Sequence, residues 1–315
     1  MSIWDFLITD ADAYREFQGG CLYLSLDYPN TCCGASVTRH EDGDIFLLDR
    51  DSDLAKLQAL ALAGQQLRMP LSNVMVLAEL LLPKLNEDPG TTELAGKLNK
   101  GLFQIMRIIN NMADAERYYP EADFKMENTE LSAFLKEVFS KAETALDREG
   151  IRIEITPLPH RVFSLVDRGG LERAIYNLIS NAVKFAKADS CIHICAAHVG
   201  SQIRISVENE GDSIPEAVQS TLFHRYQREP AIEDSRFGLG LGMSLIRSVA
   251  AMHGGTVLLD QPGGTRVTMT LTIRKRLPGS LRSPALPIGD YAGGWDTALL
   301  EFAETLPSSA YEDIF

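Results

Sequence analysis

The chain has 315 residues, of which 45% are hydrophobic and 23% charged, and it is long enough for two folded domains. Its net charge of −13 argues against nucleic acid as the main partner, because phosphate backbones are bound by clustered Lys and Arg. The one basic run, residues 274–282, is short and precedes an acidic tail. We therefore expect a solvated linker there rather than an anion site.

The N-terminal residues MSIWDFLITDADAYREF carry acidic side chains where a secretory signal has basic ones. No apolar run of the sequence approaches the ~18–20 residues that cross a bilayer. We therefore expect a cytoplasmic protein, without a membrane segment, whose five cysteines are reduced. Cys191, His193 and Cys195 alternate along one predicted strand, but three soft ligands without a fourth indicate strand residues rather than a zinc site.

Residues 1–50 contain short alternating apolar runs, CLYLSLD and DIFLLDR, which predict a short strand-rich segment. Residues 51–119 instead carry apolar residues at three- and four-residue steps, in two stretches separated by NEDPGTTE. Two amphipathic helices joined by a short loop are expected. Their apolar seams are Leu57, Leu60, Gly64, Leu67, Leu71, Val74, Ala78 and Leu81, and Leu94, Leu98, Leu102, Ile105, Ile109 and Met112.

A single helical hairpin of this kind leaves an apolar face open. Pairing two copies through residues 54–118 into a four-helix bundle would cover that face. We favour this homodimer over the alternative, in which the hairpin packs on the C-terminal domain of its own chain.

From residue 120 to 275 helical and strand-like signals alternate. TELSAFLKEVFSKAETAL and LERAIYNLISNAVKFA are predicted helices, whereas IRIEITP, RVFSLVD, CIHICAAHV and QIRISVEN are predicted strands. This order predicts an α/β sandwich with one mixed sheet, so the fold class is α+β: a dimerising helical hairpin followed by a sandwich. Residues 276–315 form a tail that ends in amphipathic WDTALLEFAETL and has six acids but no Lys or Arg after residue 289.

Three polar residues of NLISNAVKF share one helix face, because Asn177, Asn181 and Lys184 are spaced at i, i+4 and i+7. Amide oxygens suit a hard cation such as Mg2+, which also binds phosphate oxygens, and an ammonium group neutralises phosphate charge. The alternative is an exposed polar helix face, and this segment alone does not decide between the two.

Two further segments are marked by glycine. In VENEGDSIP, Asn209 ends a predicted strand and Gly211 permits close backbone approach. In FGLGLGMSLI, three glycines precede a helix, where backbone N–H groups can bind phosphate. They are Gly238, Gly240 and Gly242. A Rossmann motif would follow a first strand, whereas a long polar loop precedes these glycines.

Taken in order, these segments resemble the ATP-binding domain of sensor histidine kinases, within the superfamily of gyrase and Hsp90-type ATPases. DRGGLERAIYNLISNAVKFA is similar to the N box, and NEGDSIP to the first glycine box. LFHRYQR is similar to the phenylalanine box, and GLGLGMSLI to the second glycine box. HGGTV and GGTRVTMTL resemble the end of that fold. With the hairpin included, the resemblance covers residues 54–275.

The resemblance implies a role for each matching residue. Asn181 would ligate Mg2+ beside Asn177, Lys184 would contact phosphate, and Phe185 would pack on the adenine. Arg228, in the lid, would reach the terminal phosphate. The other residues expected to bind ATP are Asn209, Gly211, Gly238, Gly240, Gly242 and Thr265.

Two departures from the family bear on the chemistry. Asn209 stands where the family reads adenine with an acid, although an amide oxygen can still accept from the adenine amino group. Gyrase-like relatives carry a Glu four residues before the metal-binding Asn, where it activates water. Here that position is Asn177, and an amide cannot take up a proton. The resemblance thus implies nucleotide binding with slow hydrolysis.

The hairpin resembles the family's dimerisation and phosphoacceptor motif, but its reactive residues are replaced. Gln65 stands in place of the phosphoacceptor histidine, and an amide nitrogen is not nucleophilic enough to attack a phosphoryl group. Gln66 replaces the acid that activates the imidazole. Met69 replaces the Thr or Asn associated with dephosphorylating a partner regulator, whereas Arg68 and Pro70 are retained.

None of the six histidines of the sequence lies on the hairpin, so rescue of the acceptor within this chain is not expected. They are His40, His160, His193, His198, His224 and His253. We therefore expect an ATP-binding, dimeric regulatory pseudokinase of two-component signalling, with a histidine kinase or response regulator as partner. The alternatives are a kinase domain that phosphorylates a histidine on a partner chain, and a weak ATPase.

Overall fold

The structure is a computed structural model of the 315-residue chain. It describes residues 3–7, 11–28, 31–50, 54–84, 89–114, 125–215, 219, 242–261, 266–274, 291–312 and 314. Four of the residues expected to bind nucleotide lie outside these ranges, namely Arg228, Gly238, Gly240 and Thr265.

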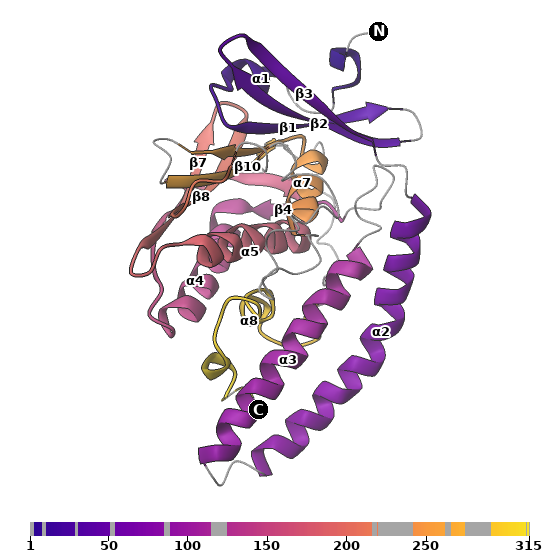
Figure 1. Ribbon diagram of the computed structural model, residues 1–315, viewed down its shortest axis with the longest axis vertical. Coiled ribbons are helices and arrows are strands. Elements are labelled where there is room, and N and C mark those ends of the chain that lie inside the picture. The colour runs from indigo at the N-terminus through magenta and orange to yellow at the C-terminus, as the bar shows by residue number, and fades with distance from the viewer. Residues whose placement is uncertain are drawn as a thin grey trace.

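Within the described residues, one mixed sheet of eight strands organises the molecule (Figure 1). Its spatial order is β3 (Gly43–Arg50), β2 (Thr31–His40), β1 (Cys21–Tyr28), β9 (Val257–Asp260), β10 (Arg266–Arg274), β8 (Gln202–Glu210), β7 (Cys191–Val199) and β5 (Arg152–Thr156). Neighbouring strands are antiparallel except β5 and β7. The N-terminal strands join the rest where Cys21 of β1 lies opposite Leu259 of β9.

Helices cover one face of this sheet. The covering layer consists of α4 (Leu131–Asp147), α5 (Arg168–Phe185) and α7 (Gly242–Met252). Along β7 and β8, buried side chains such as Ile194 and Ile205 alternate with exposed or half-buried ones, as expected when only one face is packed. A small two-stranded sheet pairs β4 (Glu127–Glu130) with β6 (Phe163–Val166). The α/β sandwich predicted from the sequence is confirmed.

Two long helices form the predicted hairpin, α2 (Leu54–Leu81) and α3 (Pro89–Ala113), and a 3-10 turn, η2 (Leu82–Lys84), follows α2 (Figure 1). A Cβ added to Gly64 would lie 2.5 Å from the Ala113 backbone nitrogen, so glycine permits the close approach of the helices. The apolar side chains buried between and around them include Ala61, Leu71, Met75, Ala78, Ala95, Leu102, Phe103, Met106 and Ile109.

The hairpin buries only part of the predicted seams. Six seam positions are at least 48% exposed: Leu67, Val74, Leu81, Leu94, Leu98 and Ile105. These six positions belong to the apolar face that a single hairpin was expected to leave open, whereas the contact stripe of α2 passes through Ala61 and Met75. None of the described helices combines the length and apolar character needed to cross a bilayer.

The C-terminal segment, defined here as residues 291–312, folds back between α3 and α5 (Figure 1, yellow). It contains α8 (Thr297–Glu301) and a 3-10 turn, η4 (Ser308–Tyr311). The Asp296 carboxylate caps α8 by accepting hydrogen bonds from the backbone nitrogens of Ala298 and Leu299 at 2.8 and 3.0 Å. The fully buried apolar side chains of the C-terminal segment include Leu300, Phe302, Leu306 and Tyr311.

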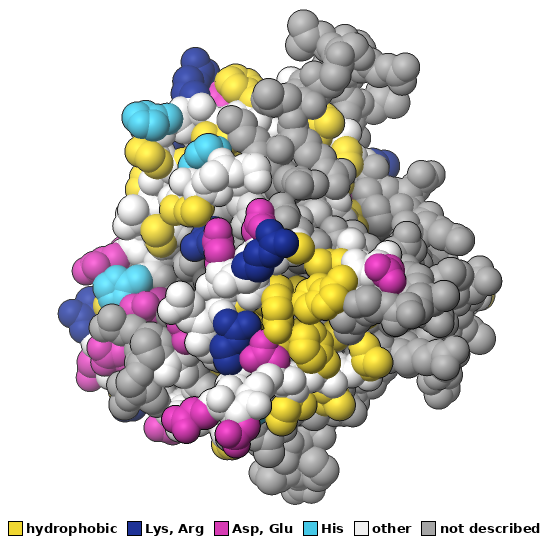
Figure 2. All heavy atoms as spheres, turned by 90° about the horizontal axis from the view of Figure 1, so that it is seen from above, with side chains coloured by type: hydrophobic (Ala, Val, Ile, Leu, Met, Phe, Trp, Pro, Cys, Tyr) yellow, Lys and Arg dark blue, Asp and Glu magenta, His cyan; other side chains and the backbone are white. Residues whose placement is uncertain are grey.

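The N-terminal elements η1 (Ile3–Phe6) and α1 (Ala11–Glu16) pack near the strand β3. The Trp4 ring lies 4.7 Å from the Tyr14 ring and 6.0 Å from the Phe46 ring, centroid to centroid. This end of the molecule shows a group of hydrophobic side chains among charged ones (Figure 2). The exposed apolar residues of this region are Trp4, Ile45, Leu47 and Leu48.

Candidate functional site

Four of the residues expected to bind nucleotide lie on α5, namely Asn177, Asn181, Lys184 and Phe185. The helix is capped by Asp167, whose side chain accepts a hydrogen bond of 3.1 Å from the Gly170 backbone nitrogen. Asn177 is 2% exposed and the Lys184 side chain 9% exposed, whereas Asn181 is half-buried. The alternative of a freely exposed polar helix face therefore does not hold for Asn177 and Lys184.

The Asn177 amide makes contacts in several directions. Its Nδ2 donates to the Arg173 carbonyl oxygen at 2.8 Å and to Glu301 Oε2 at 3.4 Å. Its Oδ1 accepts from the Arg107 guanidinium at 3.1 Å. A Cβ added to Gly242 would lie 2.7 Å from the same oxygen. Asn177 thus joins α5 to α3, to the start of α7 and to the C-terminal segment.

The Lys184 ammonium forms an ion pair with the Glu304 carboxylate of the C-terminal segment. Burial lowers the pKa of Lys184, and Glu304 partly offsets this effect. Burial would raise the pKa of Glu304, but the charges of Arg107 and Lys184 outweigh it and hold that pKa below its usual value. The cation expected to contact phosphate is therefore paired with an acid of the same chain.

A second acid of the C-terminal segment, Glu301, is 0% exposed and binds two arginines. It accepts from Arg107 Nε at 3.2 Å and from Arg173 Nε at 3.0 Å. Arg107 also lies 3.0 Å from Glu304, and Arg173 donates to Asn111 at 2.6 Å. These buried charges compensate one another, as buried ion pairs must.

Sequence reasoning did not single out these acids or their arginines. The signal that could have found them is an arginine inside an apolar helical run, in MRIIN and LERAIYN, because a buried guanidinium needs an anionic partner. The acids that match are Glu301 and Glu304, which interrupt the amphipathic segment WDTALLEFAETL.

The C-terminal end of α5 meets the end of β8. Ala186 and Gly211 form an antiparallel bridge, and a Cβ on Gly211 would lie 2.4 Å from the Phe185 carbonyl oxygen. The predicted adenine-reading residue, Asn209, is 4% exposed, and its Nδ2 has no hydrogen-bond partner among the described residues. The Phe185 side chain is 47% exposed. A buried, unpaired amide thus lies beside the glycine that contacts α5, and buried polar groups normally have partners.

Asn181, the predicted metal ligand, lies one helical turn from Asn177. Its Nδ2 contacts Met243 Sδ at 3.4 Å, and a thioether is a weak hydrogen-bond acceptor. The structure therefore gathers the described members of the predicted site around α5, from β8, from the start of α7 and from α5 itself. The contacts of Arg228, Gly238, Gly240 and Thr265 lie outside the described residues.

The hairpin carries Gln65, at the expected acceptor position, on its surface. Gln65 and Gln66 are exposed on α2, and Met69 is 68% exposed. Arg68, on the same helix, donates to the Tyr291 carbonyl oxygen of the C-terminal segment. The expected acceptor surface of α2 thus presents two amides and a thioether.

His253 is held as a structural residue. It is 1% exposed, its Nε2 accepts from the Asp167 backbone nitrogen at 3.0 Å, and its Nδ1 lies 2.6 Å from the Val249 carbonyl oxygen. Both ring nitrogens are therefore used within the sandwich, next to the cap of α5. This placement agrees with the expectation that His253 does not replace the missing acceptor.

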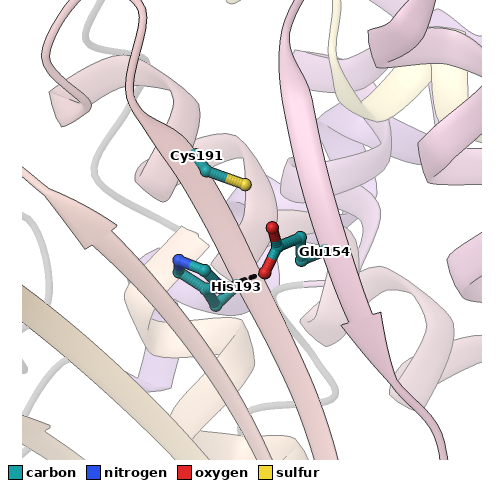
Figure 3. Close-up of side chains that lie close together, drawn as sticks. All are labelled: Glu154, Cys191 and His193. Atoms are coloured by element: carbon teal, nitrogen blue, oxygen red, sulfur yellow. Dashed lines mark ion pairs between the residues drawn. The ribbon is translucent and has the colours of Figure 1, made fainter.

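A group of possible metal ligands lies at one edge of the sheet (Figure 3). Parallel pairing of β5 and β7 places Glu154 opposite His193, with Glu154 Oε2 3.2 Å from His193 Nδ1, and Cys191 lies nearby. The third possible ligand of this group is Glu154, whereas the sequence had suggested Cys195. Burial and the Glu154 charge raise the pKa of Cys191, and the Glu154 and His193 side chains are 72% and 46% exposed. We interpret the group as an exposed Glu154–His193 pair beside the protonated thiol of Cys191.

Comparison with known proteins places these elements in one family. Residues 166–275 match the family model of the histidine kinase-, DNA gyrase B- and HSP90-like ATPase. The sensor-like histidine kinase SenX3 of Mycolicibacterium smegmatis is 28% identical over 237 residues, 73% of this chain and 61% of that protein. The sensor protein KdpD of Escherichia coli K12 is 30% identical over 217 residues, 67% of this chain and 24% of that protein.

Full-length ShkA, solved in complex with AMPPNP, has a similar fold, with a TM-score of 0.56 and 20% identity over 71% of this chain and 47% of that chain. The chain therefore spans about three fifths or less of the length of these relatives. The chain belongs to the sensor histidine kinase family, and its residues 166–275 form the ATPase-like domain of that family.

Proposed function

We propose that this protein is a nucleotide-binding regulatory pseudokinase of two-component signalling, which binds ATP with Mg2+ but does not phosphorylate itself. One observation carries the proposal: Gln65, at the expected acceptor position, and Gln66, at the expected position of its activating acid, are exposed on α2, while the described residues around α5 include those expected to bind nucleotide. The chain thus keeps the nucleotide-binding domain of the family and lacks the histidine that would accept the phosphoryl group.

The described residues fit ATP at its adenine end. Asn209 is buried with an unpaired amide donor beside Gly211, and an amide can both donate to a ring nitrogen of adenine and accept from its amino group. The Phe185 side chain is exposed at the adjacent end of α5 and can pack on a base. These three residues support binding of a purine nucleotide.

The phosphate end of the site fits Mg2+ through Asn181. Amide oxygens are suitable ligands for this hard cation, which when bound screens the phosphate charge. Lys184 is the cation nearest to Asn181 along the predicted face. Asn177 cannot act as the base of an ATPase, because its amide has no proton-accepting function at neutral pH and is already bonded to Arg107 and Glu301. This argues against the weak ATPase.

Homodimerisation through the hairpin belongs to the same proposal. The exposed apolar side chains of α2 are Leu62, Leu67, Met69, Val74, Val76, Leu77, Leu80 and Leu81. A helix that is apolar on most of its sides is normally buried, and a second hairpin would complete a four-helix bundle. Leu94, Leu98 and Ile105 of α3 are exposed too, so both helices offer apolar surface.

A second candidate function is phosphorylation of a histidine on a partner chain. Asn181 and Lys184 are compatible with it, because a phosphoryl transferase needs residues that hold the metal and the phosphates. Both functions fit a partner histidine kinase or a response regulator.

The two candidates are separated by incubating the chain with γ-labelled ATP and Mg2+, alone and with the acceptor hairpin of a complete histidine kinase. Acid-labile label is scored on each chain. The pseudokinase predicts no label on either chain, although calorimetry shows ATP binding. Label on the added hairpin would establish the partner kinase instead, and absence of ATP binding would reject both.

A further inference from the structure

The C-terminal segment places two carboxylates on the nucleotide side of α5. Glu304 pairs with Lys184, and Glu301 Oε2 lies 3.4 Å from Asn177 Nδ2. Lys184 and Asn177 are two of the three residues on which phosphate and metal binding were predicted. The acids of the segment therefore contact side chains that were expected at the phosphate and metal end of the nucleotide.

The segment is held on α3 by specific contacts. Asn99 donates to the Tyr311 carbonyl oxygen at 3.0 Å, Gln104 to that of Ala303 at 3.0 Å, and Asn110 to that of Tyr291 at 3.1 Å. Each of these three donors comes from α3, so the backbone of the segment follows one face of that helix.

Packing supports the same placement. A Cβ on Gly96 of α3 would lie 2.7 Å from the Ser308 carbonyl oxygen, so this face of α3 is shaped for the segment. Trp295 packs edge-on against Phe103 with ring centroids 6.0 Å apart, and Tyr311 does so at 5.4 Å. Apolar packing thus adds to the hydrogen bonds that hold the segment on α3.

Charge explains why the segment and the phosphates of a nucleotide exclude each other from the site. Carboxylate and phosphate oxygens are alternative ligands for the same ammonium and amide donors. Two anionic groups at Lys184 would repel each other in a site that is largely shielded from water. The ion pairs themselves contribute little net stability, because desolvation offsets most of the attraction, so a polyphosphate can exchange for them.

We propose that the C-terminal segment and ATP compete for Lys184 and Asn177, so that ATP binding requires Glu304 and its neighbours to withdraw. This inference rests on the proposed nucleotide binding and adds its regulation: the docked segment is an internal competitor of the nucleotide. Because such coupling is reciprocal, the nucleotide weakens docking of the segment by the same factor by which the segment weakens nucleotide binding.

The first test compares Mg-AMPPNP binding to the unmodified chain, to Glu304→Gln and to the matched control Glu312→Gln, by calorimetry. Glu312 belongs to the same segment and loses the same charge, but its side chain lies over Gly96 of α3. We expect Glu304→Gln to bind Mg-AMPPNP about 5- to 150-fold more tightly, the usual range of coupling between sites. The control should bind as the unmodified chain does.

The second test uses a protein in which the C-terminal segment is unchanged. Its result therefore does not depend on whether Glu304→Gln folds correctly. The chain has two tryptophans, Trp4 and Trp295. In Trp4→Phe, the fluorescence of Trp295 reports whether the segment stays packed on Phe103. Saturating Mg-AMPPNP should shift the emission to longer wavelength, and the shift should follow the binding curve.

The outcomes separate this inference from the proposed function. Tighter binding in Glu304→Gln together with a Trp295 shift supports the competition. Equal binding in all three proteins and an unchanged Trp295 spectrum at saturation would overturn the competition and leave nucleotide binding intact. If Mg-AMPPNP binds to none of the proteins, the competition and the proposed nucleotide binding both fail.

Discussion

Lys184 and Glu304 form an ion pair between residues 120 positions apart in the chain, and their side chains are 9% and 13% exposed. The lysine lies near the end of α5, and the acid follows α8. This contact ties the predicted phosphate site to the last residues of the protein. The state of the nucleotide site and that of the C-terminal segment are therefore expected to be linked, and the predictions below follow from this link and from the hairpin.

Replacing Glu301 with Ala should destabilise the fold by about 3–5 kcal/mol, because it leaves the buried charges of Arg107 and Arg173 without their shared partner. Urea unfolding measures the change in the free energy of unfolding. Glu312→Ala is the matched control and should change it by less than about 0.5 kcal/mol. A loss below 1 kcal/mol in Glu301→Ala would show that the segment is not held by this network.

Docking of the segment should weaken in acid through Glu304. The folded pKa of this carboxyl lies below its usual value, because the charges of Arg107 and Lys184 outweigh burial. The ionised carboxylate therefore contributes its full stability above the unfolded pKa of about 4.3, and the contribution disappears as pH falls through the lowered folded value.

The fluorescence of Trp295 in the Trp4→Phe protein measures this pH dependence. The emission should be constant from about pH 8 to pH 5 and should shift to longer wavelength at lower pH. The additional variant Glu304→Gln should show a smaller change over the acidic range, since the group is no longer titratable. Identical profiles for the two proteins would exclude Glu304 as a source of the transition.

Val74→Glu should give a monomer without loss of the fold. Val74 is 50% exposed in the single chain, so a charge there is tolerated, but in a bundle it would be buried without a partner. We expect dimer dissociation at micromolar concentration in light scattering and an unchanged circular dichroism spectrum. Gln58→Glu, exposed on the opposite side of α2, is the control and should remain dimeric. A monomeric unmodified protein would contradict the bundle.

Asn181→Ala should weaken Mg-dependent ATP binding about tenfold or more, because it removes an oxygen ligand whose bond to a charged group contributes about 1.5–3 kcal/mol. Calorimetry with Mg-ATP, and with ATP in the presence of a chelator, separates the metal-dependent part. Asn128→Ala, on the exposed side of β4, should bind as the unmodified chain does. If ATP binding depends equally on Mg2+ in both variants, Asn181 is not a ligand of the metal.

Local spacing was sufficient to predict the elements that carry the site. The i, i+4, i+7 spacing of polar residues in NLISNAVKF and the apolar seams predicted α5 and the two helices of the hairpin, because helix periodicity is a property of neighbouring residues. It could not predict which seam positions face the neighbouring helix. Val74 and Met75 are both apolar, yet Val74 is 50% exposed and Met75 is 0% exposed.

Contacts between residues far apart in the sequence could not be predicted from local spacing. The pairing of Cys21 with Leu259 joins the N-terminal strands to the sandwich, and neither strand contains a signal for the other. The ion pair of Lys184 with Glu304 was missed for a similar reason, since acids in a polar tail usually remain solvated. The arginines at positions 107 and 173, within apolar helix faces, could have indicated that a buried anion was needed.

The most direct test of the account is transfer from γ-labelled ATP to the chain itself, compared between the unmodified protein and variants that restore the acceptor. An amide at position 65 cannot attack the terminal phosphate, whereas an imidazole can. We predict no acid-labile label on the unmodified chain, faint label on Gln65→His, and more label when Gln66→Glu is added. Label on the unmodified chain would contradict the pseudokinase. No label on the double variant, although it binds ATP, would contradict the claim that only the acceptor has been lost.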